Sequence, residues 1–176
     1  MAENNEKFLP DKSLEELVDL LTNHEVDVDN KWERHSAAYD LGGIQDEGAV
    51  KALIKGMEDY ESDVRWACMK ALGKTGEFAV DLIIQEGLTH NNSFVSGGAA
   101  TALGFIGGRR AFDTLLQTLQ HKSAWVRWNV VRALGILGDI RAIKPLEKLL
   151  QKEEREDVIK YTEDALDKLK QNQDGY

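Results

Sequence analysis

The chain has few of the residues on which several protein classes depend. Cys68 is its one cysteine among 176 residues, which excludes a disulfide framework and any zinc site built from cysteines. Two prolines and 15 glycines exclude collagen-like and proline-rich material. No apolar run approaches the roughly 18 residues of a membrane span, and the first ten residues lack the basic and apolar regions of a signal peptide. These absences predict a soluble, cytoplasmic protein that has no membrane partner.

The chain also lacks an excess of positive charge. The formal net charge is −9, and the acidic excess lies at the two ends: residues 1–30 carry 9 acids and 2 bases, and residues 151–176 carry 8 acids and 5 bases. The middle of the chain is nearly balanced. Duplex nucleic acid is bound by several basic side chains that face phosphates, helped by the field of the whole protein. The composition therefore argues against a nucleic-acid partner.

What the chain does contain is an internal repeat. A Leu-Gly pair recurs every 31 residues, at 41–42, 72–73, 103–104 and 134–135, and a degenerate copy follows at 166–167. A second apolar series has the same period: Leu53, Ile84, Leu115 and Leu146, each followed four residues later by another apolar residue. Spacings of three and four residues place side chains on one face of a helix. Each repeat therefore predicts two helices, an A helix with the second series and a B helix with the Leu-Gly pair.

The repeat divides the chain into five helical hairpins, at residues 13–46, 47–77, 78–108, 109–139 and 140–171, flanked by flexible ends at 1–12 and 172–176. Ser13 and Glu16 fit a capping box, and Ser62 and Ser93 are expected to cap B helices. We expect the glycines of the Leu-Gly pairs to end the B helices, because glycine readily adopts left-handed backbone angles. The first hairpin has a longer loop, within residues 23–30. No single hairpin can bury its apolar face alone, so the five should stack into one core.

The segments 63–73 (DVRWACMKALG) and 125–139 (WVRWNVVRALGILGD) resemble HEAT repeats of the short type named after phycobilisome lyases. The resemblance covers residues 13–171. It implies an all-α fold, a right-handed α-solenoid whose B helices line the concave face where partners dock. The family includes protein-binding scaffolds, bilin lyase subunits, a di-iron hydroxylase and, more distantly, DNA glycosylases. The resemblance is specific for the fold and weak for the function.

The repeat register defines columns of residues on the outer face of the B helices. The expected partner-binding residues in these columns are His35, Tyr39, Trp66, Lys70, Lys74, Gly97, Gly98, Thr101, Phe105, Trp128, Asn129 and Arg132. Exposed tryptophan and arginine are the side chains most enriched at interaction hot spots. We expect the two tryptophans to flank a shallow groove at a distance of ~20 Å, two helix-pair spacings. The alternative is that both pack between neighbouring B helices.

The pair Gly97-Gly98 lies inside a predicted B helix, where glycine is unfavourable. It could form a floor that lets a ligand approach, or it could make room for a bulky neighbour, and we favour the second explanation. Arg34, Arg65 and Arg127 recur in register, and we expect them to pair with inter-repeat acids or carbonyl groups. Cys68 falls in a core column and should be a buried, inert thiol.

No catalytic set is apparent. One segment, 34–42, looks like an iron-binding helix of deoxyhypusine hydroxylase, but that family requires His-Glu pairs where this chain has 35–36 (HS), 66–67 (WA), 97–98 (GG) and 128–129 (WN). We therefore expect no metal, no cofactor and no enzyme activity, and a monomeric scaffold or adaptor that binds an acidic or extended segment of another protein. The alternative is a lyase or chaperone-like subunit acting on a chromophore- or cofactor-bearing protein.

Overall fold

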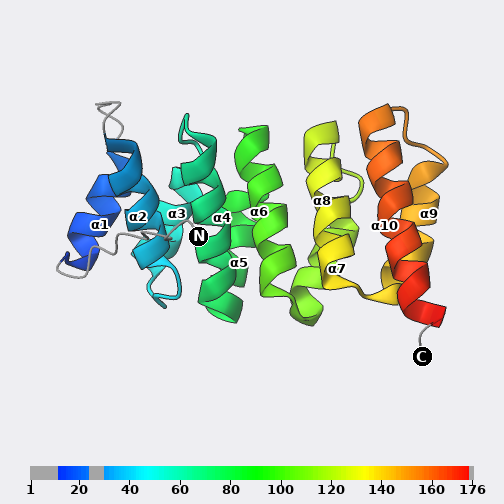
Figure 1. The fold of residues 1–176 in the computed structure, drawn as a ribbon, viewed down its shortest axis with the longest axis horizontal. Helices are drawn as coiled ribbons and strands as arrows, with labels where there is room; N and C mark the ends of the chain where they lie inside the picture. Colours follow the sequence, from blue (N-terminus) through cyan, green and yellow to red (C-terminus); the bar gives the residue numbers. More distant parts are fainter. Residues whose placement is uncertain (1–11, 24–29, 175–176) are drawn as a thin grey trace, which may run out of the picture.

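The computed structural model describes residues 12–23 and 30–174, which form a row of antiparallel helix pairs (Figure 1). The B helices are α2 (Lys31–Leu41), α4 (Ser62–Thr75), α6 (Ser93–Ile106), α8 (Ala124–Leu137) and α10 (Glu156–Asp174). The A helices are α1 (Leu14–Thr22), α3 (Glu47–Gly56), α5 (Val80–Leu82) with its π-helical continuation η3 (Ile83–Gly87), α7 (Gly108–Thr118) and α9 (Ile143–Leu150). Short 3₁₀ turns, η2 (Gly76–Ala79) and η4 (Ile140–Ala142), precede α5 and α9. The predicted five hairpins are all present in this row.

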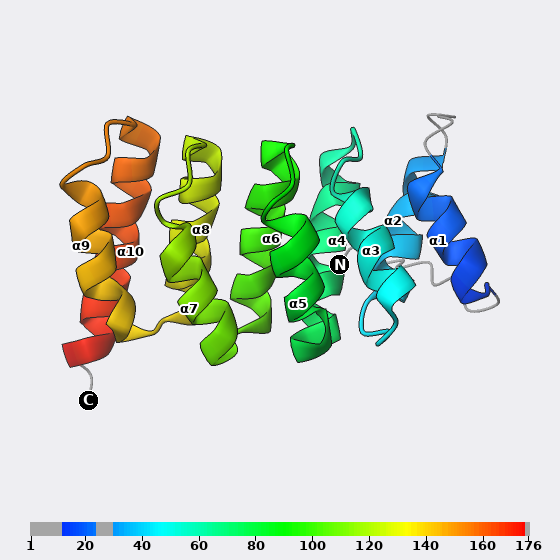
Figure 2. The ribbon, with the colours of Figure 1, turned by 180° about the vertical axis from the view of Figure 1, so that it is seen from behind.

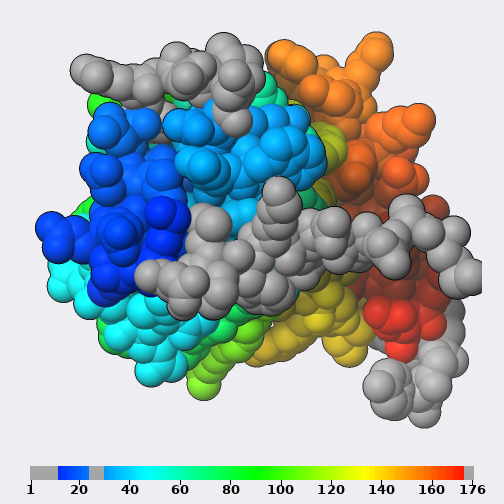
Figure 3. All heavy atoms as spheres, turned by 60° about the vertical axis from the view of Figure 1, so that its left-hand side comes forward, coloured from blue at the N-terminus to red at the C-terminus, as the bar shows by residue number. Residues whose placement is uncertain are grey.

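The helices form two layers. The B helices lie side by side in Figure 1, and the A helices cover them from behind, as Figure 2 shows. The first hairpin and the last pair, α9 and α10, form opposite ends of the stack (Figure 3). Each B helix contacts the next along the row, whereas the A helices after α3 make few contacts with one another. The stack is therefore held together mainly through its B helices. The predicted α-solenoid is confirmed.

The core follows the predicted repeat, with one local shift. The side chains of Leu41, Leu72, Leu103 and Leu134 are fully buried, as are Leu53, Leu115 and Leu146 of the second series. In the third repeat the buried residue is Ile83, whereas the predicted Ile84 is only partly buried. The π-helical turn at Ile83–Gly87 explains the shift, because a π turn fits more residues into one turn than an α-helix does.

The Leu-Gly glycines do not end the B helices as predicted. The helices α4, α6 and α8 continue past them to Gly76, Gly107 and Gly138, whose φ angles of 68°, 73° and 67° are those that favour glycine. Gly73 and Gly104 serve instead for close approach of the next B helix. A Cβ atom on Gly104 would lie 2.7 Å from Ala133 Cβ, and one on Gly73 would lie 2.6 Å from Phe105 Cβ. Only Gly42 of this series is a C-cap residue.

This packing predicts opposite effects for the same substitution at two equivalent positions. Gly104→Ala should lower the free energy of unfolding by about 1–2 kcal/mol, because overpacking against the α8 backbone outweighs the gain in helix propensity. Gly135→Ala should raise it by up to ~1 kcal/mol, since its Cβ would meet only Ala165 Cβ at 3.6 Å. Urea unfolding of both variants measures the difference. Equal stabilisation of both would show that α6 and α8 do not approach as closely as described.

The ends of several helices differ from the predictions. The capping box of Ser13 and Glu16 is confirmed. Ser62 and Ser93 are the first helical residues rather than caps, and the cap positions are held by Glu61 and by Asn92, whose side chain accepts from Phe94 N. The helix α10 runs to Asp174, so residues 172–174 belong to it and not to a flexible end. Most of the predicted long loop, residues 24–29, lies outside the described residues.

Candidate functional site

The centre of the B face is occupied by a guanidinium group that lies between two indole rings. Arg132 of α8 places its Cζ 4.7 Å from the ring centroid of Trp66 on α4 and 5.9 Å from that of Trp128 on α8. Trp66 also meets Phe105 of α6 edge to face, with centroids 5.7 Å apart. Three successive B helices therefore contribute to one cluster of two tryptophans, a phenylalanine and an arginine.

The predicted separation of the two tryptophans is wrong. Because the guanidinium contacts both rings at 4.7 Å and 5.9 Å, their centroids can be no further apart than the sum, about 11 Å, and not ~20 Å. The intervening helix α6 carries Gly97 and Thr101 in the columns of Trp66 and Arg132, so long side chains from α4 and α8 can reach across it. Both indoles are half-buried. They pack between neighbouring B helices, which is the alternative that the sequence left open.

Several basic side chains of the B helices lie over aromatic rings in the described structure. Arg65 lies 5.5 Å from the Phe94 centroid and Lys31 lies 5.7 Å from that of Trp32. Three others are Lys70, 5.9 Å from the Trp66 centroid, Lys74, 3.5 Å from that of Tyr39, and Arg132. Within the described residues none of the three forms an ion pair, and Asp164, in the column of Arg132, is not within ion-pair distance of it. We call Lys70, Lys74 and Arg132 the cation set. Its charge is not neutralised by any carboxylate of the described chain.

Four of the predicted contact residues are buried and cannot face a partner. Thr101 Oγ1 donates to the Gly97 carbonyl and to Asn129 Oδ1, and Asn129 Nδ2 donates to the Trp125 carbonyl. A Cβ on Gly97 would lie 2.9 Å from Trp125 Nε1, and one on Gly98 would lie 2.6 Å from Met57 Sδ. The two glycines therefore make room for bulky neighbours. His35 is half-buried and meets Trp32 edge to face.

A row of contacting aromatic rings, which the sequence analysis missed, crosses the first turns of α6, α8 and α10. Phe94 meets Trp125 at 5.6 Å, Trp125 stacks on Trp128 at 5.4 Å with the rings 6° from parallel, and Trp128 meets Tyr161 at 4.4 Å. We call these four residues the aromatic row. Phe94, Trp125 and Tyr161 are 54%, 45% and 37% exposed.

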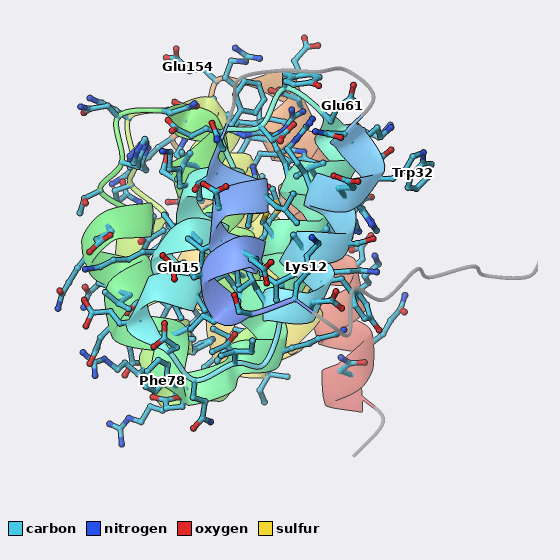
Figure 4. The ribbon with its side chains drawn as sticks, turned by 90° about the vertical axis from the view of Figure 1, so that its left-hand side faces the viewer. Lys12, Glu15, Trp32, Glu61, Phe78 and Glu154 are labelled. Atoms are coloured by element: carbon cyan, nitrogen blue, oxygen red, sulfur yellow. The ribbon has the colours of Figure 1, made fainter. Side chains whose placement is uncertain are left out.

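A sequence signal for this row did exist. The column just before the repeated valine holds Trp32, Asp63, Phe94, Trp125 and Asp157. All five are exposed, and Figure 4 shows Trp32 projecting from α2 on the B side. An aromatic side chain recurring at an exposed place of a repeat indicates a surface with a function other than core packing.

Arg34 and Arg127 pair with acids of the next repeat, as predicted, whereas Arg65 bonds to carbonyl groups of its own repeat. Arg34 donates from Nε to Asp59 Oδ2 at 2.6 Å, and Arg65 Nη1 donates to the carbonyls of Asp59 and Tyr60. Arg127 donates to both carboxylate oxygens of Glu153, at 2.6 and 2.7 Å. This hydrogen-bonded guanidinium lowers the pKa of the Glu153 carboxyl. These contacts fix the loops between A and B helices, and the guanidinium groups of Arg34 and Arg127 are occupied by carboxylates.

Burial shifts the pKa of two side chains that can act as nucleophile or base in other proteins, Cys68 and His121. Cys68 is fully buried, and burial raises the pKa of its thiol, as expected for an inert side chain. Burial lowers the pKa of His121, whose Nδ1 accepts from Ser123 N. Among residues 12–23 and 30–174, no three histidine, cysteine, aspartate or glutamate side chains are placed to hold a metal ion. In the same ranges no helix is both long and apolar enough to cross a membrane.

The sequence pattern of HEAT repeats matches residues 14–90 and 80–167, which together cover most of the chain. The chain belongs to the HEAT-repeat family. A search of curated protein sequences gives no match. The family assignment agrees with the resemblance seen in the repeated segments.

Two solved structures show the same fold. The complex of CpcE and CpcF of phycocyanin lyase from Nostoc sp. PCC7120 aligns with a TM-score of 0.62 at 20% identity, covering 86% of this chain and 96% of that chain. Human deoxyhypusine hydroxylase in complex with glycerol aligns with a TM-score of 0.54 at 19% identity, covering 90% of this chain and 74% of that chain. At these identities the similarity concerns the HEAT-repeat fold alone.

Proposed function

We propose that this HEAT-repeat protein is a non-catalytic interaction module that binds an acidic, extended segment of a partner protein on its B face. The observation that carries the proposal is the cation set, Lys70, Lys74 and Arg132, held on aromatic rings without a carboxylate partner among the described residues. Some other basic side chains of the described chain, such as Lys31, Lys51, Arg110 and Arg155, are ion-paired. The cation set combines the lack of an ion pair with a position on aromatic rings.

A cation that rests on an aromatic ring keeps its charge available to an anion. The ring face attracts the cation through its quadrupole and orders it, but it does not neutralise it. A carboxylate of a partner would therefore gain a charge-assisted interaction with a group that is already positioned. On a protein of net charge −9, cations without carboxylate partners would be the groups that draw an acidic segment to the B face.

We expect the tryptophans to dominate the affinity and Lys70 to act on the association rate. Trp66→Ala and Trp128→Ala should each weaken binding by about 2 kcal/mol or more, because each removes a ring that supports Arg132. Lys70→Ala, at an exposed position, should mainly slow association and reduce its salt dependence. The probe is the terminally blocked peptide (Ser-Gly-Glu)4, studied by calorimetry and by stopped-flow at several salt concentrations.

The matched control is Lys51→Ala on α3. Lys51 is exposed on the A side and ion-paired with Glu47 and Glu86, so its loss should leave binding unchanged. Damage from Lys51→Ala equal to that from the tryptophan variants would place the interface on the A side. If (Ser-Gly-Glu)4 does not bind at all, the proposal is wrong.

The aromatic row supports a second candidate function, a lyase or chaperone-like subunit that handles a chromophore-bearing protein. Four contacting rings at 4.4–5.6 Å could stack a planar ring system. The similar fold of a phycocyanin lyase complex makes this candidate worth testing. Quenching of tryptophan fluorescence by a bilin would support it, and no response at high micromolar bilin would count against it.

A further inference from the structure

We infer that the acidic segment bound on the B face is proline-rich and adopts a polyproline II conformation, with prolines on the aromatic row and acidic side chains on Arg132 and Lys70. This inference rests on the proposed function and names the conformation and composition of its partner. It depends in addition on the rings of Phe94, Trp125 and Tyr161, which form the aromatic row with Trp128.

The aromatic row is a preformed apolar surface. Each ring touches the next, and the Trp125 ring is also held by α6, because its Nε1 lies where a side chain on Gly97 would be. Three of the four rings are more than a third exposed. In contrast, the large apolar side chains that recur at the core positions of the repeat are buried. Rigid rings of this kind bind without ordering many rotamers, so little affinity is lost on association.

Proline-rich segments match such a surface. They adopt polyproline II without internal hydrogen bonds, lose little entropy on binding, and dock on aromatic-lined surfaces. The polyproline II helix advances ~9 Å per three-residue turn, so residues three apart face the same way. That advance is comparable to the path from Phe94 through Trp125 to Trp128, whose successive ring centroids are 5.6 and 5.4 Å apart. Successive prolines of one face can therefore rest on alternate rings.

Hydrogen bonding favours this occupant over a helix. The indole N–H groups of Trp66 and Trp128 donate to no acceptor within the described residues. A polyproline II segment has backbone carbonyls that are not used internally and can accept from these donors. The carbonyls of an α-helix are engaged in its own hydrogen bonds, except in the last turn.

The position of the cations sets the composition of the segment. Arg132 contacts Trp128, a member of the aromatic row, and Lys70 contacts Trp66 on the other side of Arg132. A chain lying on the rings thus has cations along one side. Acidic residues at every third position would all project to that side, while the two intervening prolines meet the rings. Lysine at the same positions would be repelled.

The test compares four blocked peptides of equal length by calorimetry and tryptophan fluorescence: (Pro-Pro-Glu)4, (Ser-Gly-Glu)4, (Ala-Ala-Glu)4 and (Pro-Pro-Lys)4. We expect (Pro-Pro-Glu)4 to bind at least tenfold more tightly than (Ser-Gly-Glu)4, and (Pro-Pro-Lys)4 not to bind. Trp125→Ala should remove the preference, so that (Pro-Pro-Glu)4 and (Ser-Gly-Glu)4 bind the variant with similar affinity. Trp125→Phe, which keeps a ring, should retain most of the proline preference.

Phe78→Ala is the matched control, because Phe78 is 45% exposed like Trp125 but lies away from the B-side position of Trp32 (Figure 4). It should change neither affinity. Equal affinity of the first two peptides, or tighter binding of (Ala-Ala-Glu)4, would overturn the polyproline inference and leave the proposed function standing. Failure of all three acidic peptides, or equal binding of (Pro-Pro-Lys)4, would contradict the proposed function as well. Loss of the proline preference in Phe78→Ala would also count against the inference.

Discussion

Arg34→Ala is expected to lower the free energy of unfolding by about 3–5 kcal/mol, the usual cost of leaving one charge of a buried pair without its partner. The side chains of Arg34 and Asp59 are 4% and 0% exposed. Asp59 also accepts from Glu61 N at 2.8 Å, so the pair fixes the loop between α3 and α4. The same hydrogen-bonded carboxylate raises the pKa of Arg34, which therefore stays charged. Urea unfolding at neutral pH measures the loss.

Two comparisons make this prediction specific. Arg155→Ala removes another Arg–Asp pair, with Asp157, whose side chains are both largely exposed, and it should have little effect. The double variant Arg34→Ala/Asp59→Ala should lose less stability than the sum of the single variants, because neither buried charge is then left alone. A small loss in Arg34→Ala, no greater than in Arg155→Ala, would mean that water reaches the buried pair.

Leu115→Ala should destabilise the protein by about 2–5 kcal/mol, because it leaves a cavity where a fully buried side chain lay between α7 and α8. The neighbouring Leu116 is only partly buried, so Leu116→Ala in the same helix should cost clearly less. Chemical denaturation of the two variants gives the comparison. Similar losses from both would show that the repeat register of α7 is wrong.

The effect of Leu115→Ala should also spread in a defined way. In a stack of repeats each unit contacts only its neighbours. Hydrogen exchange should therefore accelerate in α7 and α8 and, to a smaller extent, in α6 and α9. Faster exchange confined to α1 and α2, at the far end of the row (Figure 1), would contradict this arrangement.

The repeat made the fold predictable, because one period of 31 residues specifies which side chains face the core in every hairpin. Leu53, Leu115 and Leu146 are buried where the period places them. Arg34 and Arg127, which recur in the same register, are paired with acids as expected. The Leu-Gly glycines were misassigned as helix ends. Their sequence context fits a C-cap as well as a close helix contact, and only the spacing between neighbouring B helices distinguishes the two.

The candidate site was predicted only in part. The columns correctly brought Trp66, Trp128, Lys70 and Arg132 to one face. They could not show that Thr101 and Asn129 bond to each other beneath that face, nor that Trp125 continues a row of rings. A column gives the position of a Cα atom, whereas these contacts depend on the rotamers of long side chains.

By itself, the sequence determined the helices, their pairing, the core and the face on which the unusual side chains gather. These properties follow from periodicity, because burial of apolar area depends on which face a residue occupies. Only the tertiary structure decided that Arg132 joins Trp66 to Trp128 and that the cation set has no carboxylate partner in the described chain. The contact between Arg132 and Trp66 links side chains 66 residues apart in sequence, so it depends on how α4, α6 and α8 pack and not on any local pattern.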